Sequence, residues 1–261
     1  MRLTEWLQRW WRARVLLKKR IAEPVWRRVV ADVPVIARLS SADQHRLRKL
    51  SSFFLHQKVI VGAAGMELDE YMRAVIAAQA SLLVLNLGLE YYAGWVEIIV
   101  YPDAFIVSHG QQDDAGVMHH SRRALSGEAW GRGPVILSWE DIRPKPYAAH
   151  GHGLNVVLHE FAHKLDLLDG SANGMPPLHS SMPPQQWSDD FTRAYHRMLS
   201  HLDHGHRSRI DPYAIESPAE FFAVVSEFFF EKPELLQEEL PAVYAELVAF
   251  YRQDPLQYSA S

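Results

Sequence analysis

The sequence predicts an α+β fold, mostly helical with a small mixed sheet. Helical periodicity recurs along most of the chain, whereas only two short stretches, residues 95–102 and 133–142, are β-branched and bounded by turn residues. No internal repeat or low-complexity tract interrupts this pattern. The chain has 261 residues, of which 48% are hydrophobic and 22% charged, so it can bury a sizeable core like an ordinary globular protein.

The chain opens with a basic arm. Residues 1–30 carry nine Lys and Arg against two acids, while the other 231 residues carry 18 bases and 29 acids. Five apolar residues of the arm share one face of a predicted helix: Trp6, Trp10, Trp11, Leu17 and Ile21. Such a helix either contacts an anionic membrane or a partner, or packs on its own domain. We treat residues 1–34 as a basic amphipathic N-terminal helical extension and 35–261 as the main domain.

The remaining elements follow in order. A helix over residues 40–57 begins with Ser40 or Ser41 as its cap, and a long buried helix over residues 67–87 ends near Gly88. The two strands follow. After an irregular stretch, residues 187–203 are helical in pattern, and two further helices close the chain.

Composition also limits the chemistry and the location. The chain has no cysteine, which excludes disulfides, thiolate metal sites and a cysteine nucleophile. The longest apolar run, residues 74–89, is short for a membrane span and contains polar residues. The arm lacks the uninterrupted apolar run of a signal peptide. We therefore expect a cytoplasmic protein.

The segment "LNVVLHEFAHKLDLLDG", residues 154–170, carries the chemistry. On a helical wheel His159, His163 and Asp166 share one face, and the opposite face is apolar, with Asn155 as a cap and Gly170 as a stop. Two imidazoles one turn apart suit two ligands of one zinc ion. Glu160 lies between them, within reach of a water molecule as general base. Asp166 is a candidate to orient an imidazole.

A catalytic zinc usually has three protein ligands, so a third must come from elsewhere. The segment after residue 210 offers Glu220, Glu227 and Glu216, besides aspartates. Glu220 also stands three residues after Ser217, with Pro218 between them, which is the pattern of a helix cap. The residues alone leave these alternatives open.

The chain resembles the Mlc titration factor A family of bacterial zinc peptidases, which belongs to the gluzincins. The similar segments, spread over residues 35–258, are "LGLEYYAGWVEIIVYPDAF", "GPVILSWEDI", "GLNVVLHEFAHKLD", "IDPYAIESPAEFFAVVSEFFF" and "FYRQDPLQ". The resemblance implies a zincin-like metallopeptidase domain over residues 35–261 with one Zn²⁺ per chain. It implies His159, His163 and Glu220 as metal ligands and Glu160 as the catalytic glutamate. Tyr213 matches the tyrosine with which similar gluzincins, including the lethal-factor-like group, stabilise the tetrahedral intermediate.

The same resemblance implies partners. The family binds the glucose-responsive repressor Mlc, lifts repression of sugar-transport genes, and is credited with aminopeptidase activity. We therefore expect a peptide substrate, an Mlc-like transcriptional repressor as partner, and no direct contact with nucleic acid. The alternative is a repressor-sequestering protein with only residual peptidase activity. "GPVILSWEDI" is our candidate for the edge strand along which a peptide lies extended. Residues 1–30 depart from the family, so no role is carried over to them.

Overall fold

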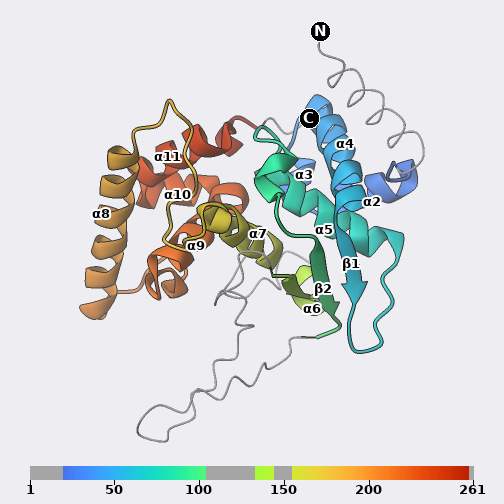
Figure 1. Ribbon diagram of the computed structural model, residues 1–261. Helices are drawn as coiled ribbons and strands as arrows, with labels where there is room; N and C mark the ends of the chain where they lie inside the picture. The colour runs from blue at the N-terminus through green and yellow to red at the C-terminus, as the bar shows by residue number, and fades with distance from the viewer. Residues whose placement is uncertain (1–19, 104–132, 144–154, 259–261) are drawn as a thin grey trace, which may run out of the picture.

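The chain, described here from a computed structural model over residues 20–103, 133–143 and 155–258, is mostly helical around one small sheet (Figure 1). The elements follow in this order: α2 (Glu23–Asp32), α3 (Pro34–Ala37), α4 (Ser41–Gln57), β1 (Val59–Gly62), α5 (Glu70–Leu83), η1 (Leu89–Tyr92), β2 (Glu97–Tyr101), β3 (Val135–Ser138), α6 (Trp139–Ile142), α7 (Val156–Asp166), η3 (Leu167–Asp169), α8 (Pro184–Asp203), η4 (Pro212–Ile215), α9 (Pro218–Glu231), α10 (Pro233–Glu239), α11 (Pro241–Tyr251) and η5 (Pro255–Gln257). Within these ranges every helix is too short or too polar to cross a bilayer.

The described part of the basic arm packs on its own domain. Ile21 is buried, and α2 turns Trp26 and Val29 into the same core. The predicted contact of residues 1–30 with an anionic surface depends mainly on tryptophans that lie outside the described residues, so it stays a prediction. The predicted domain boundary at residue 34 stays one too.

The two helices predicted after the basic arm are both present, and the predicted cap of the first is confirmed. Ser40 caps α4, because its side chain accepts a hydrogen bond from the Asp43 amide. The long buried helix begins at Glu70 rather than at residue 67, because Asp69 caps it, and a turn leads from its end to Gly88. Gly88 has a φ of 101°, a backbone conformation that suits glycine.

The sheet is parallel throughout its described strands, in the order β1-β2-β3, so the predicted mixed sheet is wrong there. The connection from β1 to β2 runs through α5, and such a crossover returns the chain in the same direction. Ile60 pairs with Ile98, and Ile98 with Val135, so the three strands align apolar residues. Strand β1 was not predicted.

Two further predictions are corrected at element ends. The second predicted strand, over residues 133–142, ends at Ser138, and residues 139–142 form the short helix α6. Its Glu140 and Asp141 favour a helix start, since acids stabilise the first turn. Three helices rather than two close the chain after α8. Pro233 and Pro241 each begin a new helix, because proline fits a first turn but breaks a helix interior.

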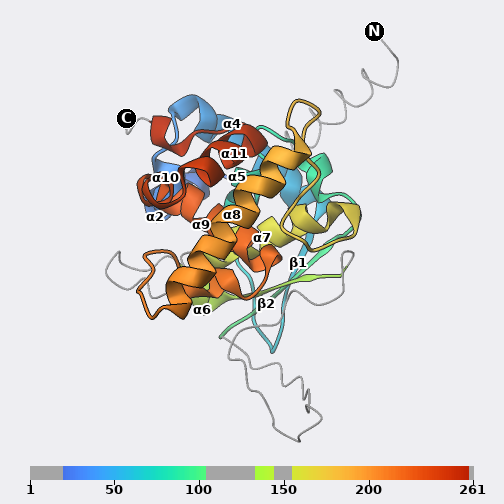
Figure 2. The ribbon, with the colours of Figure 1, turned by 90° about the vertical axis from the view of Figure 1, so that its left-hand side faces the viewer.

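Helix α7 lies in the middle of the molecule. The N-terminal helices, in blue and teal, and the C-terminal helices, in orange and red, lie on opposite sides of it in Figure 1. Figure 2 shows α8 and α11 in front of α7 and α5 after a quarter turn. Phe161 of α7 packs against the rings of Phe54, Tyr92 and Trp95, with centroids 5.1–5.7 Å apart. This aromatic cluster holds the back of α7 in the core.

Candidate metal centre

The predicted division of α7 into an apolar back and a polar front is confirmed. Five apolar residues of the helix have no exposed surface: Val157, Leu158, Phe161, Ala162 and Leu165. The Asn155 side chain caps the helix by accepting a hydrogen bond from the Leu158 amide at 3.1 Å. Gly170, in the left-handed conformation, ends the turn that follows. The local sequence thus fixes which way His159 and His163 point.

Three potential ligand atoms converge in front of this helix. His159 Nε2 lies 3.1 Å from His163 Nε2. Glu220 Oε2 lies 3.0 Å from His159 Nε2 and 3.4 Å from His163 Nε2. Among the described residues this is the one group of at least three His, Asp or Glu side chains close enough to share a metal ion. Glu216 stays outside it, at the end of η4.

Glu220 both belongs to a helix cap and faces the histidines. The Ser217 hydroxyl accepts a hydrogen bond from the Glu220 amide at 3.1 Å, so the cap uses the Glu220 backbone. The Glu220 carboxylate takes no part in this cap contact, and its Oε2 lies close to both His159 and His163. The cap and the ligand, weighed as alternatives from the sequence, therefore use different atoms of the same residue.

The geometry fits a metal ion better than it fits a hydrogen-bonded cluster. Glu220 Oε2 is buried, yet among the described residues no donor is aligned to bond it, although both imidazoles are near. A buried carboxylate oxygen without a partner is costly. Four ligands about 2.0–2.1 Å from a tetrahedral zinc are about 3.3–3.4 Å apart. The three observed separations are close to that spacing, so His159, His163 and Glu220 could hold a metal ion.

Glu227 contacts the other nitrogen of His159. Its Oε1 lies 2.6 Å from His159 Nδ1. Asp166, predicted to orient an imidazole, is engaged elsewhere: it is fully buried, and its Oδ2 accepts a hydrogen bond from the Gly174 amide at 2.8 Å. The carboxylate that contacts Nδ1 of His159 thus comes from α9, which packs against α7, rather than from α7 itself.

The cluster is electrostatically coupled. Burial alone would raise the pKa of the Glu220 carboxyl, but the contacts with His159 and His163 outweigh burial and hold that pKa well below its ordinary value. Burial would lower the pKa of His159, but Glu220 and Glu227 outweigh it and raise that pKa well above 6.5. Burial also raises the pKa of Asp166, to about 6. The carboxylates of Glu220 and Glu227 therefore favour a positive charge at His159.

The two predicted catalytic residues lie beside the cluster. Glu160 is buried on α7 between the two histidines, and its charge contributes to raising the pKa of His159. Tyr213 lies on η4, where Asp211 accepts a hydrogen bond from its amide, and its ring centroid is 6.1 Å from that of His159. The structure thus brings His159, His163 and Glu220 together, with the Tyr213 ring near His159 and Glu160 next to His159 along α7. From the sequence, Glu227 was an alternative third ligand. In the structure its carboxylate contacts Nδ1 of His159 and stays outside the group of three.

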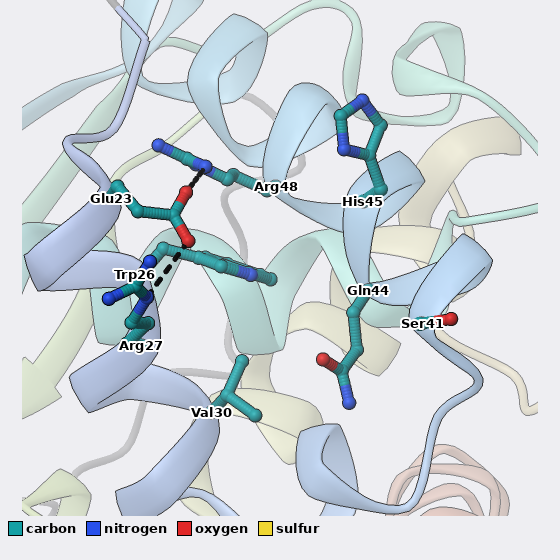
Figure 3. A pocket seen from close by; sticks show the side chains of 8 residues that line it. All are labelled: Glu23, Trp26, Arg27, Val30, Ser41, Gln44, His45 and Arg48. Atoms are coloured by element: carbon teal, nitrogen blue, oxygen red, sulfur yellow. Dashed lines mark hydrogen bonds and ion pairs between the residues drawn. The ribbon is translucent and has the colours of Figure 1, made fainter. Parts of the chain in front are cut away.

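A separate hollow of about 270 Å³ opens between α2 and α4 (Figure 3). Its charged groups are paired with one another, because Glu23 accepts hydrogen bonds from both Arg27 and Arg48. The lining residues are Glu23, Trp26, Arg27, Val30, Ser41, Gln44, His45 and Arg48. This hollow is separate from the group formed by His159, His163 and Glu220, which is the candidate site.

Comparison with known proteins places this geometry in a family. Residues 7–252 match the glucose-regulated metallo-peptidase M90 family. A protein of Klebsiella pneumoniae called Mlc titration factor A is 41% identical over 237 residues, which cover 90% of this chain and 88% of that protein. A protein of the same name from Yersinia enterocolitica is 36% identical over 257 residues, covering 97% and 92% respectively. The chain belongs to the glucose-regulated metallo-peptidase M90 family.

Proposed function

We propose that the chain is a zinc-dependent peptidase. One observation carries the proposal: two imidazole nitrogens and a buried carboxylate oxygen without an aligned hydrogen-bond donor converge within 3.4 Å, in a chain of a metallopeptidase family. His159, His163 and Glu220 would hold the ion. When bound, zinc supplies a Lewis acid that acidifies a water molecule and polarises the scissile carbonyl.

The chain's own residues would divide the proton transfers and the charge stabilisation. Glu160 would accept a proton from the attacking water and deliver it to the leaving amine. Its place next to His159 on α7, and the contribution of its charge to the raised pKa of His159, support this assignment. Tyr213 would donate a hydrogen bond to the oxyanion of the tetrahedral intermediate, and its ring beside His159 supports that role.

Strand β3 supports binding of an extended peptide by strand addition. Among the described strands it pairs with β2 and stands at the end of the order β1-β2-β3. Lys164 of α7 donates a hydrogen bond to the Gly133 carbonyl at 2.9 Å, just before β3 begins. This contact ties the strand to the helix of the site. The family resemblance favours hydrolysis of the aminopeptidase type.

The test combines metal analysis with cleavage of a peptide library, with and without a chelator. We expect one zinc per chain and cleavage that the chelator abolishes and added zinc restores. Peptides with an acetylated N-terminus should resist cleavage if the activity is of the aminopeptidase type. Absence of zinc, or cleavage insensitive to chelation, would refute the proposal.

A second function, binding of an Mlc-like repressor, is favoured by the name of the relatives, Mlc titration factor A. Binding and cleavage can use different surfaces, so the two functions are compatible. Relief of repression in cells by a chain with Glu160→Gln separates them. Relief that persists in this variant supports a binding function independent of hydrolysis, and relief that is lost makes hydrolysis part of the regulation.

A further inference from the structure

Two glutamates of α9 contact the two ring nitrogens of His159. Glu220 Oε2 lies 3.0 Å from Nε2, and Glu227 Oε1 lies 2.6 Å from Nδ1. The two glutamates are seven residues apart on α9, which places them about two turns apart on nearly the same face. Glu227 is more deeply buried than Glu220, with 7% of its side chain exposed against 17%. Water therefore has less access to the Nδ1 contact than to the ligand side.

The second oxygen of Glu227 is also engaged. Its Oε2 accepts a hydrogen bond from the Asn155 amide at 2.9 Å. The Asn155 side chain in turn donates to Gln79 at 2.5 Å and to Glu231 at 2.8 Å, while its Oδ1 caps α7 through the Leu158 amide. Asn155 thus joins α5, α7 and α9 next to Glu227. The carboxylate of Glu227 is consequently held through Oε1 by His159 and through Oε2 by the Asn155 amide.

We infer that Glu227 is a positioning residue that fixes the tautomer and the orientation of His159. A carboxylate can only accept, so the proton of a neutral His159 belongs on Nδ1, and the lone pair on Nε2 faces the metal. This inference rests on the proposed zinc site. It assigns Glu227 an effect on metal affinity although it is not a ligand.

Glu227→Gln is a sharp test because both oxygens of Glu227 act as acceptors. Glutamine has the same shape but only one acceptor, so either His159 or the Asn155 amide loses its partner. Glu231→Gln is the matched control. Glu231 stands one turn further along the same helix, its substitution removes the same charge, and glutamine can still accept from the Asn155 side chain.

The experiment measures zinc affinity by competition with a chelator of known affinity, for the wild type and both variants. We expect Glu227→Gln to bind zinc about 10–100-fold more weakly, as for other residues that orient a ligand histidine. Glu231→Gln should stay within about threefold of the wild type. The visible absorption of the Co²⁺-substituted protein should change in Glu227→Gln only. Equal affinities for Glu227→Gln and wild type, or equal losses in both variants, would overturn the inference.

Two further outcomes separate this inference from the proposed function. A wild-type chain that binds no zinc refutes the proposed function, whereas tight wild-type binding with no loss in Glu227→Gln refutes only the role of Glu227. If Glu227→Gln does not fold, nuclear magnetic resonance of the zinc-loaded wild type with ¹⁵N-labelled histidine decides. A slowly exchanging proton on His159 Nδ1 supports the inference, and an unprotonated Nδ1 overturns it.

Discussion

The Gly174 amide donates a hydrogen bond to Asp166 Oδ2 at 2.8 Å, which fastens the loop after α7 to the end of that helix. The same glycine touches the start of α9, because a Cβ built on it would lie 2.4 Å from the Pro218 carbonyl oxygen. The Trp187 indole donates to the Gly174 carbonyl at 3.1 Å. Gly174 therefore sets the distance between the helix that carries the two histidines and the helix that carries Glu220.

Gly174→Ala should weaken both the fold and the metal site. Its φ of +78° disfavours a side chain, and the new methyl group would push Pro218 away, so we expect a loss of about 2–4 kcal/mol in unfolding free energy and weaker zinc binding. Gly170→Ala is the control, because its φ is +94° but no atom lies within 4 Å of the added Cβ. It should cost about 1 kcal/mol and leave zinc affinity unchanged. Urea unfolding and chelator competition measure both; equal zinc affinities in the two variants would contradict the prediction.

Glu160→Gln and Glu220→Gln should separate catalysis from metal binding. Glu160→Gln removes the proposed general base but no ligand, so zinc content should stay at one per chain while hydrolysis is lost. Glu220→Gln should lose most of the zinc, because an amide is a weaker ligand than a carboxylate. Atomic absorption after dialysis and a peptide-cleavage assay give the two readouts. Full activity of Glu160→Gln, or full zinc content of Glu220→Gln, would count against the assigned roles.

Tyr213→Phe should lower kcat about 10²–10³-fold with little change in KM, since the lost hydrogen bond serves the oxyanion rather than the bound substrate. Zinc content and the thermal unfolding midpoint should remain those of the wild type. The ring is kept, so packing beside His159 is preserved. A variant that changes KM alone would place the Tyr213 hydroxyl in substrate binding instead.

Removal of the metal should lower the stability of the fold. The ion would join α7 to α9. A ligand that binds only the folded chain stabilises it by about 2.7 kcal/mol when the free ligand concentration is one hundred times the dissociation constant. Chelation should therefore lower the thermal midpoint of the wild type and of Glu160→Gln alike. The midpoint of Glu220→Gln should hardly respond, and a large response there would mean that the ion is held by other residues.

Stability should also rise with pH between about pH 8 and pH 10 because of Lys58. Burial, with repulsion from Lys164, lowers the pKa of Lys58 to about 8, and its ammonium lies against the carbonyls of Tyr92 and Trp95. In the unfolded chain the pKa returns to about 10.4, so the unfolded state binds more protons in this interval and the folded state gains. Relative to Lys58→Met, the wild type should gain on the order of 1–2 kcal/mol over this interval. Parallel pH profiles of unfolding free energy would contradict this.

Much of the site could be predicted because it is encoded locally. The spacing of His159 and His163, the Asn155 cap and the apolar back of α7 all lie within a few turns of one helix, and the structure has them as predicted. The choice of Glu220 over Glu227 could not be made from the residues alone. Both lie on nearly the same face of α9, and only the packing of α9 against α7 decides which nitrogen of His159 each one meets.

The fold was predictable where the sequence marks the end of an element. Ser40 marks the start of α4, and α5 ends at Leu83, one turn before Gly88. Strand β1 was missed because it has four residues directly after a helix, and its pairing with β2 is a contact between distant segments. The parallel direction of the sheet is likewise a property of the crossover connection and not of any strand sequence.

The start of α9 makes the placement of Glu220 a matter of counting. Ser217 and Pro218 fix where the helix begins, and each residue of an α-helix turns by about 100°. Inserting one residue between Pro218 and Glu220 would therefore swing the carboxylate to the side of the helix, and Glu227 would turn with it. Both partners of His159 would be misaligned by one insertion that leaves every side chain of the site intact. The number of residues between Pro218 and Glu220 therefore matters to the site as much as the identity of the glutamates themselves.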